Sequence, residues 1–191
     1  SPSGSNAMRR DRSWMNRFDP TDEQIQEAAE WYAGVEVIDW IDEVIEGDIV
    51  PRTYIGDGRM RHTHPDGGTE PINGRILEVP QDRELATARH PYSGFTVYAP
   101  SGSLTRGEEL ATTGANGQTF VCSTCHGTDL KGLGDVPRLA GISPLYIVRQ
   151  LNDFRNGDRA GTLASLMTLA VANLTDEDIV ALSAYLGSLD P

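Results

Sequence analysis

Two cysteines and a histidine fall within five consecutive residues, Cys122-Ser123-Thr124-Cys125-His126, and the 191-residue chain has no other cysteine. Two thiols about one helical turn apart can add to the two vinyl groups on one edge of a porphyrin. The adjacent imidazole then lies under the ring, where it can bind the iron, and the C-x-x-C-H pattern is typical of this attachment. The sequence therefore predicts one haem c, bound covalently by Cys122 and Cys125, with His126 as an axial ligand.

Three other uses of this motif fit less well. A structural zinc site needs four ligands, and the chain has no second cysteine pair. A redox-active dithiol is expected within a strand–helix unit, whereas glycines at positions 114, 117 and 127 surround this motif. A plain disulfide would leave His126 without a role.

Composition excludes two classes of partner. The chain has 16 Lys+Arg against 28 Asp+Glu, a net charge of −12. Such a chain lacks the basic face that neutralises nucleic-acid phosphates. No stretch approaches the run of about 18 apolar residues that a transmembrane helix needs. Aromatic residues make up 7%, so a core of protein alone would be modest, and we expect part of the chain to fold around the macrocycle.

Residues 101–191 are expected to form a mainly α domain that binds the haem. A helix is predicted over 104–112, with Ser103 or Thr105 as its N-cap. A second begins at Ser143-Pro144, a hydroxyl cap followed by proline, and ends near Gly157. The last begins at Thr175, where three acidic residues suit a helix N-terminus.

The N-terminal part contains one predicted helix, from about Thr21 to Val35. Residues 1–7 are small and polar, and we interpret them as an expression scar. The helix opens as the last helix does: Thr21 to Ile25 aligns with Thr175 to Ile179, at an offset of 154 residues. Residues 8–38 are therefore predicted to be a helical remnant of a first cytochrome-like domain.

Residues 39–100 have few helix signals and many prolines and turn sequences. Short strands are predicted at Val50–Ile55 and Arg75–Val79. A structureless stretch of this length is uncommon in a compact chain, so we expect a linker that wraps over the C-terminal domain with a small hairpin.

Met167 is the predicted second axial ligand of the iron. It lies in an expected loop between two helices, from which its thioether could reach the face opposite His126; the alternative is a flexible core residue. The other candidate side chains are Met8, Met15, Met60, His62, His64 and His90. His62 and His64 would share one side of a strand, and we expect them to be solvated surface residues rather than a metal site.

Taken together, the motifs resemble class I cytochrome c, in particular the C-terminal half of bacterial two-domain, di-haem cytochromes. The resemblance spans about Ser101 to Leu189. It rests on Gly107-x-x-Leu110, Cys122–His126-Gly127, Gly132–Gly134, Pro137-x-Leu139-Ala140-Gly141, Tyr146-x-x-x-Gln150-Leu151-x-x-Phe154-Arg155-x-Gly157-x-Arg159, Met167, Leu174-Thr175 and Ala184-Tyr185-Leu186.

The resemblance implies further roles. The Pro137 carbonyl would accept a hydrogen bond from the proximal imidazole, which fixes the tautomer of His126. Gly107 would let the first and last helices approach closely near Tyr185. The candidates for the haem edge and propionates are Tyr146, Arg149, Gln150 and Arg159, each of which could instead be part of a solvated face.

The implied function is electron transfer, without enzymatic activity of the chain itself. Two alternatives stay open: an electron-entry subunit of an oxidoreductase complex, and a haem enzyme or gas sensor with an open sixth coordination site. Because covalent haem attachment takes place outside the cytoplasm, we expect the protein in the bacterial periplasm. An acidic carrier is expected to dock on a basic patch of its redox partner. The N-terminal helix, within an acidic run from Asp19 to Asp48, could form a subunit contact.

Overall fold

The computed structural model describes residues 20–191, which belong to two units, residues 1–37 and Ile38–Pro191. The expectations for residues 1–7 and for Met8 and Met15 lie outside the described residues. Helix α1 (Asp22–Ala33) belongs to the N-terminal unit. The Thr21 side chain accepts a hydrogen bond from the Gln24 N–H, and the Gln24 side chain accepts one from the Thr21 N–H. This capping box confirms the predicted start.

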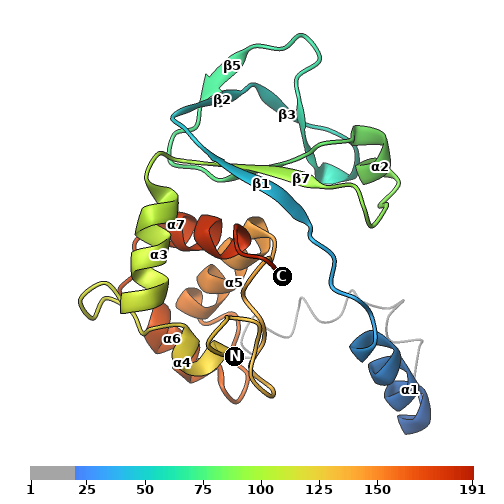
Figure 1. Cartoon of the computed structure of the whole chain (residues 1–191), viewed down its shortest axis with the longest axis vertical. Helices are drawn as coiled ribbons and strands as arrows, with labels where there is room; N and C mark the ends of the chain where they lie inside the picture. Colours follow the sequence, from blue (N-terminus) through green and yellow to red (C-terminus); the bar gives the residue numbers. More distant parts are fainter. Residues whose placement is uncertain (1–19) are drawn as a thin grey trace, which may run out of the picture. The chain divides into compact units, whose positions relative to one another are not determined.

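The C-terminal unit carries the other helices (Figure 1): α2 (Arg83–Thr87), α3 (Ser103–Thr113), α4 (Ser123–His126), α5 (Pro144–Asn156), α6 (Ala164–Val171) and α7 (Asp176–Gly187). Ser143 caps α5, and Gly157 ends it in the left-handed region at φ 77°. Thr175 forms a capping box at the start of α7. Both predicted starts are confirmed. Among the described helices none is long and apolar enough to span a bilayer.

The predicted cap of α3 is wrong. The N-cap is Gly102, at φ 84°, without a side-chain hydrogen bond, and Ser103 lies inside the helix. The reason is a distant acceptor: Glu46 Oε1 accepts a hydrogen bond from the Leu104 N–H at 2.8 Å. This carboxylate satisfies one of the N–H groups that a helix start leaves unpaired.

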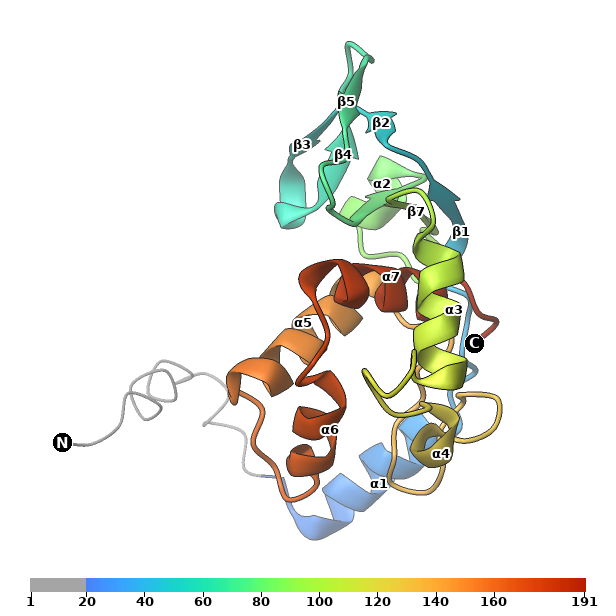
Figure 2. The same ribbon diagram turned by 90° about the vertical axis from the view of Figure 1, so that its left-hand side faces the viewer.

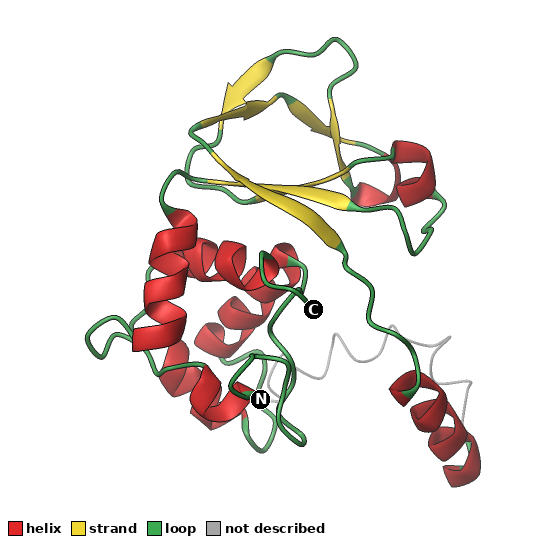
Figure 3. Cartoon of the chain, viewed as in Figure 1, coloured by secondary structure: helices red, strands yellow, loops and turns green. Residues whose placement is uncertain are grey.

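Strands gather at one end of the C-terminal unit (Figure 3). In the three-stranded sheet, β7 (Phe95–Ala99) lies between β1 (Ile41–Glu46), which is parallel to it, and β6 (Leu77–Pro80), which is antiparallel. Two antiparallel pairs join β2 (Ile49–Pro51) to β5 (Thr69–Pro71) and β3 (Thr53–Ile55) to β4 (Arg61–Thr63), with the short helix η4 (Asp57–Arg59) between β3 and β4. The strand expected at Val50–Ile55 is two short strands, β2 and β3, and the one expected at Arg75–Val79 is β6 with shifted bounds. Strands β1, β4, β5 and β7 were not predicted.

Helix α7 lies next to the sheet, between it and the core of the haem-binding helices (Figure 2). Ala184 on one side of α7 packs with Ile41, Phe95 and Val97 of the sheet. Leu182 and Leu186 on the other side belong to the helical core. The expected contact between residues 39–100 and the helical part is therefore present, and it is made by a sheet rather than by a small hairpin.

Helices α3 and α7 cross at Gly107. A Cβ atom at this position would lie 2.3 Å from the Ala181 carbonyl oxygen and 2.5 Å from Tyr185 Cβ. Only a residue without a side chain permits this separation of the two backbones. The predicted role of Gly107 is confirmed.

Candidate haem site

The C-x-x-C-H residues form the short helix α4, which ends at His126. The His126 ring is buried, and its Nδ1 lies 2.7 Å from the Pro137 carbonyl oxygen. A carbonyl can only accept, so this contact places the ring proton on Nδ1 and leaves the Nε2 lone pair free for a metal. This is the contact that the family resemblance implies for Pro137.

The loop that presents the Pro137 carbonyl folds back over α4. The Gly127 backbone, at φ 85°, packs closely against this loop. A Cβ atom at position 127 would lie 2.7 Å from the Gly132 carbonyl oxygen. The Gly132 N–H in turn donates to the His126 carbonyl at 2.9 Å. Glycine at 127 therefore permits both the left-handed backbone and the close approach that hold Pro137 next to the imidazole.

Both thiols are free; Cys122 is half-buried and Cys125 exposed. The Cys122 N–H donates to the Ala111 carbonyl at 2.9 Å, which ties α4 to the end of α3. Burial raises the pKa of the Cys122 thiol to about 11, so this thiol is protonated at neutral pH. Two free thiols separated by two residues suit the two vinyl groups of a porphyrin.

Met167 lies on helix α6, so the expected loop position is wrong. Its side chain is half-buried and packs against the helical core. On the same helix or at its start, Leu163, Leu166 and Leu169 are 58–61% exposed. This concentration of exposed leucines is what an apolar group bound here would cover.

The four candidates for the haem edge divide into two groups. Arg159 Nη1 donates to Gln150 Oε1 at 2.7 Å, and the guanidinium lies 4.6 Å from the centre of the Phe154 ring. Tyr146 and Arg149 are exposed on α5. The structure thus brings Gln150 and Arg159 together, although Arg159 is exposed like Tyr146 and Arg149.

His62 is not the solvated residue that was expected. Its side chain is buried, and neither ring nitrogen has a hydrogen-bond partner. The ring centre lies 5.8 Å from that of Tyr54 on the paired strand. The Gly56 backbone packs against the ring so closely that a Cβ atom at position 56 would lie 2.7 Å from His62 Cδ2. His64 instead contacts Arg52 Nη2 at 2.8 Å. Within residues 20–191 no group of three or more His, Cys, Asp or Glu side chains could hold a metal ion.

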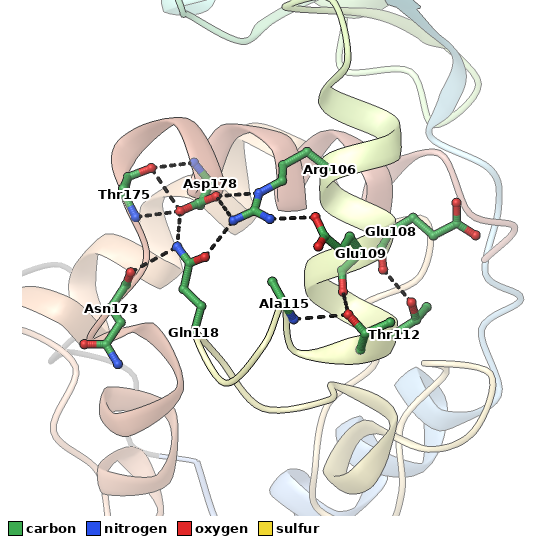
Figure 4. Close-up of polar contacts among 10 residues, drawn as sticks. Arg106, Glu108, Glu109, Thr112, Ala115, Gln118, Asn173, Thr175 and Asp178 are labelled. Atoms are coloured by element: carbon green, nitrogen blue, oxygen red, sulfur yellow. Dashed lines mark hydrogen bonds and ion pairs between the residues drawn. The ribbon is translucent and has the colours of Figure 1, made fainter.

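Sequence reasoning missed a polar network that joins α3, α7 and the loop before Cys122 (Figure 4). Arg106 Nε donates to Asp178 Oδ1 at 2.9 Å, and Arg106 Nη2 donates to Gln118 Oε1 at 2.6 Å. Gln118 Nε2 donates to Asp178 Oδ2. The members lie up to 72 residues apart in the sequence, so no local pattern could reveal the network.

Asp178 is the buried centre of this network. Burial alone would raise its pKa, but hydrogen bonds from the Thr175 N–H, the Arg106 guanidinium and the Thr175 hydroxyl outweigh that effect. The pKa of Asp178 therefore lies below its ordinary value.

The donor set fits a covalent haem: two free thiols, an imidazole oriented through Nδ1, and a methionine on a helix with exposed leucines. This combination offers soft and nitrogen donors and an apolar surface, as haem c requires.

Comparison with known proteins gives the same result. The Cytochrome c family model matches residues 104–190. Cytochrome c-554(548) from Halomonas halodenitrificans is 43% identical over 69 residues, which are 36% of this chain and 83% of that protein. Cytochrome c4 from Stutzerimonas stutzeri is 32% identical over 139 residues, 64% of this chain and 65% of that protein.

A third relative is named for its partner enzyme. The thiosulfate dehydrogenase electron acceptor from Stutzerimonas stutzeri is 41% identical over 78 residues, and the match covers 40% of this chain but 35% of that protein. The chain thus spans only part of its longer relatives, while it covers most of the short cytochrome c-554(548). The motif, the helical fold and these similarities agree: the chain belongs to the class I c-type cytochromes.

Proposed function

We propose that this protein carries single electrons through one haem c, attached at Cys122 and Cys125, with His126 and Met167 as axial ligands. The observation that carries the proposal is the His126–Pro137 contact beside the two free thiols. When bound, the haem supplies an iron that alternates between two oxidation states.

The residues of the chain have separate tasks in this proposal. Cys122 and Cys125 fix the porphyrin edge. The Pro137 carbonyl orients the His126 ring and increases its basicity as a ligand. Met167 would supply the second protein ligand to the iron, which would leave no site for a substrate. Gln150 and Arg159 would donate hydrogen bonds to a propionate, and Tyr146 and Arg149 are proposed for the exposed edge.

The experiment is spectroscopic. Holoprotein made with a haem-attachment system should gain the mass of one haem, because the sequence has one C-x-x-C-H motif. It should show a low-spin spectrum with the weak red sulfur-to-iron charge-transfer band, and its reduced form should not respond to CO. A high-spin spectrum or rapid CO binding would instead favour the alternative of an enzyme or gas sensor with an open site.

The partner is proposed to be a redox protein with a basic docking patch in the periplasm. The chain's net charge is −12, and acidic carriers are drawn to basic surfaces at rates that fall with ionic strength. The naming of one relative as an electron acceptor for thiosulfate dehydrogenase supports a role as the acceptor or entry subunit of an oxidoreductase. An electron-transfer rate independent of salt would contradict the charged docking.

We also propose that α1 is the terminal helix of a cytochrome-like domain. At the 154-residue offset, Ile25 corresponds to Ile179 and Tyr32 to Leu186. In α7, Ile179 and Leu186 are each 1% exposed and belong to the helical core. In α1, Ile25 and Tyr32 are 52% and 71% exposed. On the side of α7 that faces the sheet, Ala184 corresponds to Glu30, which is polar. So α1 repeats the core face of α7 but not its sheet face.

The proposed role of α1 as a contact is tested by deletion of residues 1–38. If its apolar face covers another surface, on this chain or on a partner, the deletion lowers either the number of subunits per particle in solution or the thermal stability. No change in either measurement would contradict a contact through α1.

A further inference from the structure

Two side chains in one loop connect the elements that carry the proposed axial ligands. Gln118 and Thr119 lie between α3 and α4. Thr119 Oγ1 donates to the Ala170 carbonyl at 2.8 Å, and Gln118 Nε2 donates to the Asn173 carbonyl at 3.2 Å. Thr119 precedes Cys122 by three residues, and Ala170 follows Met167 by three. We call residues 118–119 the strap.

The backbone of the strap is fixed on the α3 side. Residues 115–117 all have positive φ, at 44°, 59° and 87°, and the Thr119 N–H closes the loop on the Gly114 carbonyl at 3.1 Å. Gly114 itself is at φ 69°, and a Cβ atom there would lie 2.5 Å from the Thr119 carbonyl oxygen. Such a sequence of left-handed residues persists only where the surrounding contacts determine it.

The Gln118 amide fixes the strap to two further elements (Figure 4). Its oxygen accepts from Arg106 of α3, and its nitrogen donates to Asp178 of α7 as well as to the Asn173 carbonyl. Both ends of the amide are therefore used, and the side chain has little freedom to move.

The end of α6 needs such a support. The last four carbonyls of a helix have no partner within the helix. The C-cap of α6, Ala172, is in the right-handed conformation, and the last turn contains no basic side chain. The Thr119 hydroxyl supplies a donor to the Ala170 carbonyl in that last turn.

We propose that Thr119 is a positioning residue: its hydroxyl holds the end of α6 so that the Met167 thioether stays on the iron. This inference rests on the proposed function, since it takes Met167 as the sixth ligand. Loss of the Thr119 hydrogen bond then increases the fraction of protein in which the thioether has left the iron.

The test is a titration of the ferric holoprotein with imidazole, followed through the loss of the charge-transfer band. Imidazole binds only when Met167 is off the iron, so its apparent affinity reports the dissociated fraction. Thr119→Val should raise this affinity by roughly five- to tenfold, the effect of losing one hydrogen bond. Thr119→Ser, which keeps the hydroxyl, should behave like the unchanged protein.

A matched control separates positioning from general loosening. Thr112 is exposed on α3, and its hydroxyl donates to the Glu108 carbonyl of the same helix at 2.7 Å. Thr112→Val should leave the imidazole affinity unchanged. An equal rise in Thr112→Val and Thr119→Val, or no rise in Thr119→Val, would overturn the inference.

The outcomes also separate this inference from the function on which it rests. If the unchanged protein lacks the charge-transfer band, Met167 is not the ligand, and both proposals are wrong. If the band is present and Thr119→Val binds imidazole like the unchanged protein, only the strap is wrong. Should Thr119→Val give no holoprotein, Thr119→Ala is titrated in its place, because it removes the hydroxyl without adding a methyl group.

Discussion

Gly107 and Asp178 show how single residues determine the contact between α3 and α7. Gly107 removes the side chain that would separate the two helices, and the Arg106 guanidinium, one position earlier, pairs with Asp178 at 2.9 Å. Gly107 permits the close approach of α3 and α7, and the Arg106–Asp178 ion pair fixes the register of the two helices.

Gly107→Ala should destabilise the protein by about 1–3 kcal/mol, because overpacking at a tight contact exceeds the helix-propensity gain of about 1 kcal/mol. The added Cβ would meet the Ala181 backbone, which cannot rotate away. Denaturant unfolding measures the loss. Gly161→Ala is the control, since a Cβ there meets nothing within 4 Å; equal stability of the two variants would contradict the tight crossing.

Asp178→Asn should cost about 1.5–3 kcal/mol at neutral pH, the range for hydrogen bonds to a charged group. Because the pKa of Asp178 is lowered in the folded state, its contribution is full above the ordinary aspartate pKa and is lost as the pH falls through the lowered value. The stabilities of the variant and the unchanged protein should therefore converge in acid. The control is Asp190→Asn, at an exposed carboxylate; an Asp178→Asn protein as stable as this control at neutral pH would contradict the contribution of the network.

At the scale of elements, Glu78 of β6 connects the sheet to the start of α5. Its Oε2 accepts from Ser143 Oγ at 2.7 Å and from the Leu145 N–H at 3.3 Å. A carboxylate at a helix N-terminus is favourable, because it meets unpaired N–H groups and the positive end of the helix dipole.

Glu78→Ala should lower the free energy of unfolding by about 1–3 kcal/mol, since it leaves the Ser143 hydroxyl and the Leu145 N–H, both in part-buried contacts, without their acceptor. Glu78→Gln, which keeps one oxygen acceptor, should lose less. Thermal unfolding compares both with Glu108→Ala, at an exposed site on α3. A loss no larger than in that control would show that the contact between β6 and α5 contributes little.

Elements defined by local chemistry could be predicted from the sequence, and the others could not. Thr21, Ser143 and Thr175 cap helices as expected, because a cap depends on the next three residues. The start of α3 is different, because its acceptor Glu46 lies 58 residues away in the sequence. Helix α6 was missed because its apolar residues face outward as well as inward, so the usual amphipathic period is absent.

The haem site follows the same division. The covalent motif could be predicted from five consecutive residues, and the Pro137 contact was implied by the resemblance to class I cytochrome c. The strap and the burial of His62 could not be predicted, since they depend on pairing between strands and on contacts between distant loops. A spacing of two residues says which side a strand residue takes, but not whether that side is covered.

At the scale of the whole chain, the sheet of residues 41–99 and the haem-binding helices form one unit. Unfolding of that unit should be a single transition. In a Trp14→Phe, Trp31→Phe background, Trp40, which stacks on Phe95 at 4.9 Å, reports on the sheet. In denaturant unfolding, the midpoint of the Trp40 fluorescence change should equal the midpoint of the far-UV circular dichroism change, which follows the helices. A fluorescence transition at lower denaturant would show that the sheet unfolds separately.

The central claim is that Met167 completes a six-coordinate haem and so makes the protein an electron carrier. Met167→Ala should abolish the sulfur-to-iron charge-transfer band, give a high-spin ferric spectrum and allow the reduced protein to bind CO. Met60→Ala, at a second half-buried methionine among the described residues, should keep the low-spin spectrum. A Met167→Ala protein that retains the band and excludes CO would contradict the account.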